Sequence, residues 1–234
     1  MILVFGSGKN TGVASIAQQH FGASAAEGKS GFCYAIPVWL NNHLVKLDDV
    51  ASSIRALIDF AKENPGIKFY MTRVACDDGE YRDDQIAPLF IDAPENITIP
   101  GVWLNEIRSI IKKPQISRIV VTGPRNFIDY PLMAANIDFY ISRLNMESIE
   151  IISGGDVGVD AMGAKYAVER GVAISSPHLD IEKFGRAVGY AFCNHLLAIY
   201  ATHVLAFHDS RSLVIKSLID VSMKAGLKVA VVNI

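Results

Sequence analysis

Residues 116–123 read Ile-Ser-Arg-Ile-Val-Val-Thr-Gly, a largely apolar run closed by a glycine, and residues 116–122 of this run are predicted to form a buried β-strand. Further apolar stretches follow at residues 149–153, 172–174, 203–207 and 227–232. Helical patterns separate them, near residues 130–145, 158–170, 184–200 and 211–225. Buried strands that alternate with helices are typical of a parallel sheet covered on both faces. We therefore predict a doubly wound α/β domain, with its ligand crevice at the C-terminal ends of the strands.

The segment before this domain predicts where it begins. Residues 102–113 form a helical pattern that ends in two lysines, and Pro114 follows. We place a domain boundary there, which divides the chain into residues 1–113 and 114–234. The first domain also has an α/β pattern, in a less regular order. Its expected strands are residues 1–5, 33–38 and 67–75, and its expected helices are residues 13–21, 47–62 and 85–90.

Composition excludes several classes of protein. The chain has 234 residues, of which 50% are hydrophobic and 20% charged, so it can bury a core and is not disordered. No apolar run approaches the roughly 18 residues of a membrane span, and the N-terminus lacks the basic flank of a secretory signal. Three widely spaced cysteines indicate neither disulfides nor a zinc site. We expect a soluble cytoplasmic protein with no metal and no cofactor.

Charge narrows the expected partners. The first 113 residues hold 11 basic and 13 acidic residues, and the remaining 121 hold 11 of each. Neither part has the basic excess that drives binding to a phosphate polymer. We therefore expect no nucleic-acid partner, whereas a small phosphate ligand needs only two or three local donors.

Two glycine-bearing loops, residues 123–127 and 153–160, follow the first two strands of the second domain. Backbone N–H groups at such strand-to-helix turns favour an anion, and glycine lets a phosphate approach closely. Arg125 would bind phosphate or carboxylate, and Asp160 would cap its helix or accept hydrogen bonds from ribose hydroxyls. Asp209 and Ser210 form a third polar corner after the fourth strand. The alternative is that these are ordinary tight turns, with Asp160 as a cap and Arg125 on the surface.

The second domain resembles the YspA-like branch of the SLOG superfamily through VTGPRNFIDY, IEIISGGDVGVDAMGAKYAVERG and FGRAVGYAFCNHLLAIYATHVLAFHD. The resemblance implies a Rossmann-like fold, a nucleotide-derived ligand such as ADP-ribose, and self-association into a homo-oligomer. The residues that match the family are Gly123, Arg125, Phe127, Gly154, Gly155, Gly158, Asp160, Gly185, Arg186, Gly189 and Asn194.

The chain also departs from the family at positions that bind phosphate. Pro124 replaces a serine, and Val157 and Cys193 replace arginines. Val214 and Ile215 replace the Gly-Thr pair that opens the last helix. The PGGxGTxxE segment of the phosphoribohydrolases is absent, which removes the carboxylate expected for cleavage of a glycosidic bond.

The first domain begins with a loop that only looks like a P-loop. The Walker pattern requires a glycine where Leu3 stands and a serine or threonine after Lys9, and neither is present. The domain instead resembles phage and bacterial macro-like proteins through FGSGKNTGVASIA, FCYAIP and TRVACDDGEYRDDQIAPLF. This resemblance implies a smaller macro-like α/β domain that binds ADP-ribose. Its candidate binding residues are Gly6, Ser7, Thr72 and Arg73.

The macro-like segment departs from its family too, because Ala75, Asp77 and Asp78 stand where glycines would leave room for a diphosphate. Thr72 and Arg73 also fit ordinary strand-end residues.

Among other chemistries, His208 with Asp209 would suit a base and its acidic partner, and we favour a binding or capping role for this pair.

Three hypotheses follow. The first is a binder of ADP-ribose, an NAD-derived molecule or a cyclic ADP-ribose relative, acting in NAD-derived signalling or in phage–host conflict, in the host cytoplasm if phage-encoded. The second is a hydrolase of nucleotide N-glycosidic or phosphoester bonds. The third is an assembly protein whose sites have degenerated, with side chains such as Val214 and Ile215 filling the crevice.

Overall fold

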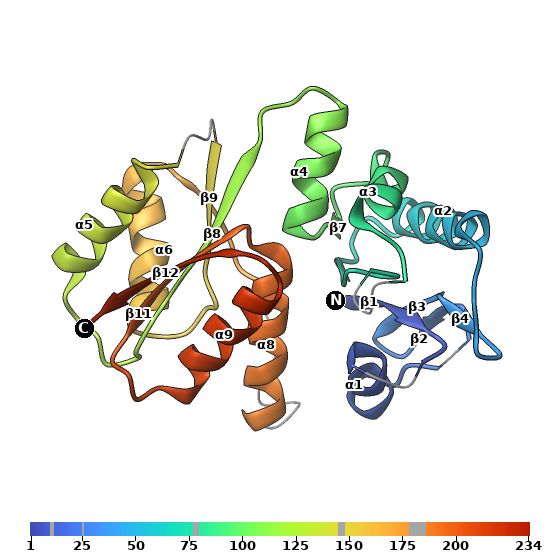
Figure 1. Ribbon diagram of the computed structural model, residues 1–234, viewed down its shortest axis with the longest axis horizontal. Helices are drawn as coiled ribbons and strands as arrows, with labels where there is room; N and C mark the ends of the chain where they lie inside the picture. Colours follow the sequence, from blue (N-terminus) through green and yellow to red (C-terminus); the bar gives the residue numbers. More distant parts are fainter. Residues whose placement is uncertain (10–11, 25, 77–79, 145–147, 178–185) are drawn as a thin grey trace. The chain divides into compact units, whose positions relative to one another are not determined.

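The structure, a computed structural model, describes residues 1–9, 12–24, 26–76, 80–144, 148–177 and 186–234. It divides into two compact units, Met1–Ile111 (unit 1) and Lys112–Ile234 (unit 2), which are coloured blue to green and green to red in Figure 1. The division falls two residues before the boundary that the sequence predicted. Each unit has its own parallel-stranded sheet and its own hydrophobic core.

Unit 2 is built on five parallel strands in the order β10-β9-β8-β11-β12. The chain runs outward from β8 through β9 to β10, and then returns to the other side of β8 for β11 and β12. This is the strand order of a Rossmann-like fold, so the predicted fold class is confirmed. The strands are β8 (Ile116–Thr122), β9 (Ser148–Ile152), β10 (Ala173–Ser175), β11 (His203–His208) and β12 (Lys228–Asn233).

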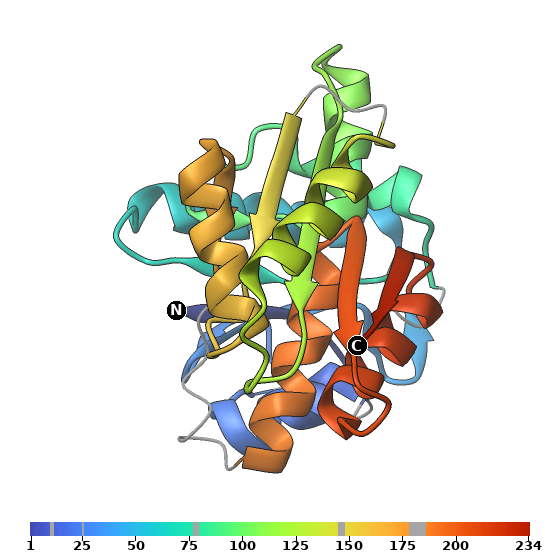
Figure 2. The same cartoon turned by 90° about the vertical axis from the view of Figure 1, so that its left-hand side faces the viewer.

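Helices cover both faces of this sheet. Figures 1 and 2 show α5 (Tyr130–Ile141) and α6 (Val159–Arg170) on one face, and α8 (Arg186–Tyr200) and α9 (Leu213–Lys224) on the other. Met133 and Ile137 of α5 pack with Ile119 of β8 in one core. Because both faces are covered, the central strands are buried along nearly their whole length, which explains their continuous apolar sequence.

Unit 1 has a five-stranded sheet in the order β2-β3-β1-β6-β7. Only β2 runs antiparallel to its neighbour β3, and β4 pairs with β5 in a separate hairpin. The strands are β1 (Ile2–Ser7), β2 (Gly28–Ser30), β3 (Cys33–Pro37), β4 (Trp39–Leu40), β5 (His43–Leu44), β6 (Phe69–Met71) and β7 (Ile97–Thr98). The helices are α1 (Gly12–Phe21), α2 (Leu47–Glu63), α3 (Asp83–Ile86), the 3-10 helix η1 (Ala87–Phe90) and α4 (Gly101–Ile110).

Two predicted elements of unit 1 are shorter than expected. The strand expected over residues 67–75 extends only from Phe69 to Met71. Ile67 closes a turn instead, since its backbone N–H donates a hydrogen bond to the Asn64 carbonyl at 3.0 Å. The helix expected to reach residue 113 ends at Ile110, and Lys112 adopts a left-handed backbone conformation with φ of 54°.

Two features are absent from the part of the chain that the structure describes. None of the helices found there is long and apolar enough to cross a membrane. In the same part of the chain, no three His, Cys, Asp or Glu side chains gather in a way that could hold a metal ion.

Candidate ligand-binding site

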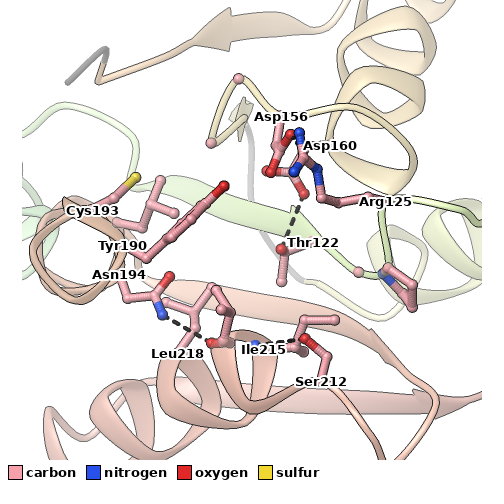
Figure 3. Close-up of a pocket in the computed structure, with 16 residues that line it drawn as sticks. Thr122, Arg125, Asp156, Asp160, Tyr190, Cys193, Asn194, Ser212, Ile215 and Leu218 are labelled. Atoms are coloured by element: carbon pink, nitrogen blue, oxygen red, sulfur yellow. Dashed lines mark hydrogen bonds and ion pairs between the residues drawn. The ribbon is translucent and has the colours of Figure 1, made fainter. Parts of the chain in front are cut away.

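A cavity of about 460 Å³ lies in unit 2 at the C-terminal ends of β8 and β9. β8 is the strand from which the chain turns to either side of the sheet, and ligands of open α/β sheets bind at such a switch point. Figure 3 shows the walls, which come from the loops after β8 and β9, from α8 and from the start of α9. The lining residues are Thr122, Gly123, Pro124, Arg125, Gly154, Gly155, Asp156, Asp160, Tyr190, Cys193, Asn194, Leu197, Ser212, Val214, Ile215 and Leu218.

Asp160, in the first turn of α6, lies in the wall of the cavity and is only 6% exposed. Its carboxylate accepts a hydrogen bond from the Thr122 hydroxyl at 3.0 Å, and it also faces the backbone N–H groups of Gly123 and Gly154, which lower its pKa. We expected these two amides to face an anionic ligand; the anion that they face in this structure is a carboxylate of the protein itself.

Burial, together with the negative charge of Asp156, raises the pKa of Asp160 from 3.8 to about 6. The hydrogen bonds from Thr122, Gly123 and Gly154 oppose this rise because they stabilise the ionised form. The carboxylate is therefore mostly ionised at pH 7, yet it can take up a proton in mildly acidic solution.

The glycines of these loops are required by packing within the protein. A Cβ atom on Gly123 would lie 2.5 Å from Val159 Cγ2 and 2.9 Å from Phe207 Cβ. Gly158 has a φ of 76°, and a Cβ there would lie 2.3 Å from the Pro124 carbonyl oxygen. The loops after β8 and β9 thus contact each other directly, which leaves no room for side chains at these positions.

Arg125 stands at the outer end of the cavity. Its Nε atom lies 2.9 Å from Asp156 Oδ1, and its side chain is 64% exposed. The two opposite charges form a pair beside Asp160, as Figure 3 shows. With Asp160 ionised, the three charged side chains of the cavity sum to one negative charge.

The opposite wall is formed by α8 and α9. Tyr190 projects from α8 into the cavity (Figure 3), and Asn194 donates a hydrogen bond to the Val214 carbonyl at 2.9 Å. Val214 and Ile215 line the cavity without filling it. Cys193 also lines this wall, and its pKa is raised to about 11, mainly by burial, so the thiol is protonated at neutral pH and unsuited to nucleophilic attack.

The structure brings six of the predicted site residues to this cavity: Gly123, Arg125, Gly154, Gly155, Asp160 and Asn194. Gly158 lies in the same loop but outside the lining. α8 begins at Arg186, whose side chain is outside the described part of the structure.

The polar corner after β11 turned out to be a self-contained turn. The Asp209 carboxylate accepts hydrogen bonds from the backbone N–H groups of Arg211 and Ser212, at 2.9 and 3.1 Å. Ser210 adopts a φ of 61°, and only Ser212 of this corner reaches the cavity. Asp209 and Ser210 therefore shape the loop that leads into α9.

The residues predicted in unit 1 lie at or near the ends of β1 and β6. Ser7 and Thr72 are buried at the ends of the adjacent strands β1 and β6. Gly6 precedes Ser7 in β1. The Arg73 guanidinium donates two hydrogen bonds to the Asp83 carboxylate, at 2.6 and 3.2 Å. This arrangement favours the alternative of ordinary strand-end residues, while Asp77 and Asp78 lie outside the described residues.

Sequence reasoning missed several residues that line the cavity. Thr122 is the last residue of a strand that was predicted with the correct bounds, so its position at the sheet edge was already visible. Asp156 lies within a loop that was singled out, but its pairing with Arg125 had no local signal. Tyr190 and Ser212 approach the cavity only because α8 and α9 pack side by side.

Comparison with known families supports the reading of unit 2. Residues 117–184 match the YspA, cpYpsA-related SLOG family. The match runs from β8 past β10 and includes both glycine-bearing loops and Asp160. SLOG proteins generally bind or modify nucleotide-derived ligands. The match does not extend into unit 1, and no curated protein matches the chain.

Proposed function

We propose that unit 2 binds a nucleotide-derived small molecule in the cavity at the ends of β8 and β9. The observation that carries this proposal is the position of the cavity at the switch point of the sheet. The loops after β8 and β9, which form two of its walls, belong to the segment that matches the SLOG family. Its volume of about 460 Å³ falls in the range of sites for small molecules.

The chemistry of the two walls suits a nucleoside. The side chains of Tyr190, Leu197 and Leu218 offer an aromatic and apolar surface to a base. On the opposite wall, the carboxylates of Asp156 and Asp160 can accept hydrogen bonds from ribose hydroxyls. Arg125 provides a cation at the outer end, where a phosphate can remain partly solvated.

The preferred ligand classes are ADP-ribose, other NAD-derived molecules and cyclic ADP-ribose relatives. The same proposal includes three further points. They are a role in NAD-derived signalling or phage–host conflict, a macro-like function of unit 1, and assembly into a homo-oligomer. The open cavity argues against a degenerate site filled by Val214 and Ile215.

Thermal unfolding of the full chain with ADP-ribose, NAD and cyclic ADP-ribose tests the proposal. A ligand at a hundredfold over its Kd should add roughly 2.7 kcal/mol to the free energy of unfolding. Arg125→Ala should weaken ADP-ribose binding about tenfold. Arg170→Ala, which removes an exposed arginine paired with Asp138 outside the cavity, should leave binding unchanged. The absence of any shift with all three ligands would overturn the proposal.

A second candidate is hydrolysis of an N-glycosidic bond, and it is favoured by one observation. The pKa of Asp160, about 6, lies near the range required of a general acid or base. Chromatography after long incubation with NAD and ADP-ribose would detect products, and these should disappear in Asp160→Ala. Intact nucleotide in the wild type would dismiss this candidate.

A further inference from the structure

We propose that the Asp160 carboxylate occupies the place of a ligand phosphate at the Gly123 and Gly154 amides, so that the inner end of the cavity accepts an uncharged, hydrogen-bond-donating part of the ligand. Any phosphate of the ligand then lies at the outer end, beside Arg125. The position of the Asp160 carboxylate is a property of the chain alone. The orientation of the ligand, by contrast, rests on the function proposed above.

The donors around Asp160 are those of an anion site. Two backbone N–H groups, from the ends of the adjacent strands β8 and β9, and the Thr122 hydroxyl point at the same carboxylate. Amides at strand-to-helix turns bind phosphate oxygens in many α/β proteins. A Cβ atom built on Gly154 would lie 2.5 Å from Asp160 Oδ2, so the carboxylate is packed tightly against that strand end.

Charge strengthens this exclusion of phosphate. Asp156 is the charged group in the cavity nearest along the chain to Asp160, and its negative charge already disfavours ionisation of Asp160. A phosphate beside both carboxylates would meet two like charges in a poorly solvated place. Arg125, the basic residue in the lining, is paired with Asp156 at the exposed end of the cavity.

Asp160 retains capacity for at least one more hydrogen bond. An ionised carboxylate offers about four acceptor positions; the Thr122 hydroxyl donates to one of them, and the Gly123 and Gly154 amides face the carboxylate as well. A ribose hydroxyl or a base amino group can satisfy the remaining position. The inner end therefore selects for a donor group and against an anion.

The position of the Asp160 carboxylate can be tested without any nucleotide. The test is whether an added anion restores the thermal stability of a variant that lacks this carboxylate. Asp160→Ala removes the carboxylate and leaves the Gly123 and Gly154 amides unsatisfied, so its Tm should fall. Inorganic phosphate at about 10 mM and constant ionic strength should then raise the Tm of this variant by roughly 5 °C more than that of the wild type. Equal responses of the two proteins to phosphate would overturn the proposal.

Two controls separate this effect from general stabilisation by salt. Asp129→Ala removes an exposed carboxylate that accepts one N–H, from Leu132, at the start of α5. It should respond to phosphate as the wild type does, because water can solvate the amide that it exposes. Asp160→Asn keeps the shape of the side chain and fills the same place, so it should fold and should not gain a specific response to phosphate.

Adenosine and AMP test the orientation of the ligand. In the wild type Arg125 can favour the phosphate of AMP, and in Asp160→Ala the preference for AMP over adenosine should be at least about tenfold larger than in the wild type. A preference for AMP that is equal in the two proteins, or smaller in Asp160→Ala, would contradict the inference. If the wild type binds neither compound nor the ligands named above, the proposed function fails, and the phosphate experiment still decides the role of Asp160.

Discussion

The side-chain amide of Asn194 donates a hydrogen bond to the backbone carbonyl of Val214 at 2.9 Å, and so joins α8 to the first turn of α9. Asn194 is buried, and both residues line the cavity. This side chain therefore helps to hold together, at the site, two helices on the same face of the sheet, in addition to their apolar packing.

Asn194→Ala should lower the free energy of unfolding by about 1–3 kcal/mol, because it leaves a partly buried carbonyl without its donor. Urea unfolding followed by circular dichroism measures this loss. Asn136→Ala is a matched control, since Asn136 donates to the Leu132 carbonyl at 2.8 Å on the exposed side of α5. Its loss should be within about 0.5 kcal/mol. Equal losses in the two variants would show that the link between α8 and α9 adds little.

Asp160 and His203 should have opposite effects on stability between pH 4 and pH 6. The pKa of Asp160 is raised in the folded protein to about 6, so its stabilising contribution is present below about pH 4 and is lost as pH rises through 6. Burial lowers the pKa of His203 to about 4, so its contribution is present above about pH 6.5 and is lost as pH falls through 4. Each effect is on the order of 3 kcal/mol.

Single substitutions should separate these two effects in urea unfolding measured at several pH values. Relative to the wild type, Asp160→Asn should become more stable as pH rises from 4 to 6, and His203→Phe should become less stable. Other titrating groups cancel in this comparison because both variants retain them. A pH profile that does not change in Asp160→Asn would mean that this carboxyl titrates normally in the folded protein.

Arg73 should contribute more to stability than Arg82, although both pair with a neighbouring aspartate. Arg73 makes two hydrogen bonds to Asp83 in a partly buried place, and Asp83 also accepts one from Trp103 Nε1 at 2.6 Å. Arg82 pairs with Asp84 in an exposed place. We expect a loss of about 1–3 kcal/mol for Arg73→Ala and about 0–1 kcal/mol for Arg82→Ala. Urea unfolding of both variants tests this, and a larger loss in Arg82→Ala would refute it.

Gly123→Ala should destabilise the protein by roughly 2–4 kcal/mol, because the new methyl group would overlap Val159 and Phe207. Gly66→Ala is the control, since a Cβ there would meet nothing within 4 Å and the backbone has no positive φ. That substitution should be neutral or slightly stabilising. Thermal unfolding distinguishes the two, and a neutral Gly123→Ala would mean that the loops after β8 and β9 can move apart.

The strands of unit 2 could be predicted from the sequence to within about one residue, because apolar residues dominate each of these runs and the central strands β8 and β11 are buried along most of their length. The short strands of unit 1 could not. β4, β5 and β7 have two residues each, too few to show an alternating pattern.

The site was predictable in its position but not in its bonding. Gly123 and Gly154 could be placed at the cavity because glycine loops follow predicted strands. The carboxylate that faces their amides belongs to Asp160, which lies 38 residues beyond its hydrogen-bond partner Thr122 in the chain. Such a contact depends on how α6 packs against β8, and no local pattern in the sequence encodes it.

His203 stands at the first residue of β11, whereas Asp160 lies beside the opposite ends of the strands, where the cavity opens. The length of the sheet thus separates the residue that limits tolerance to acid from the residue that shapes the binding surface. An engineer could replace the histidine to extend the working range of the protein toward low pH while leaving its recognition chemistry intact.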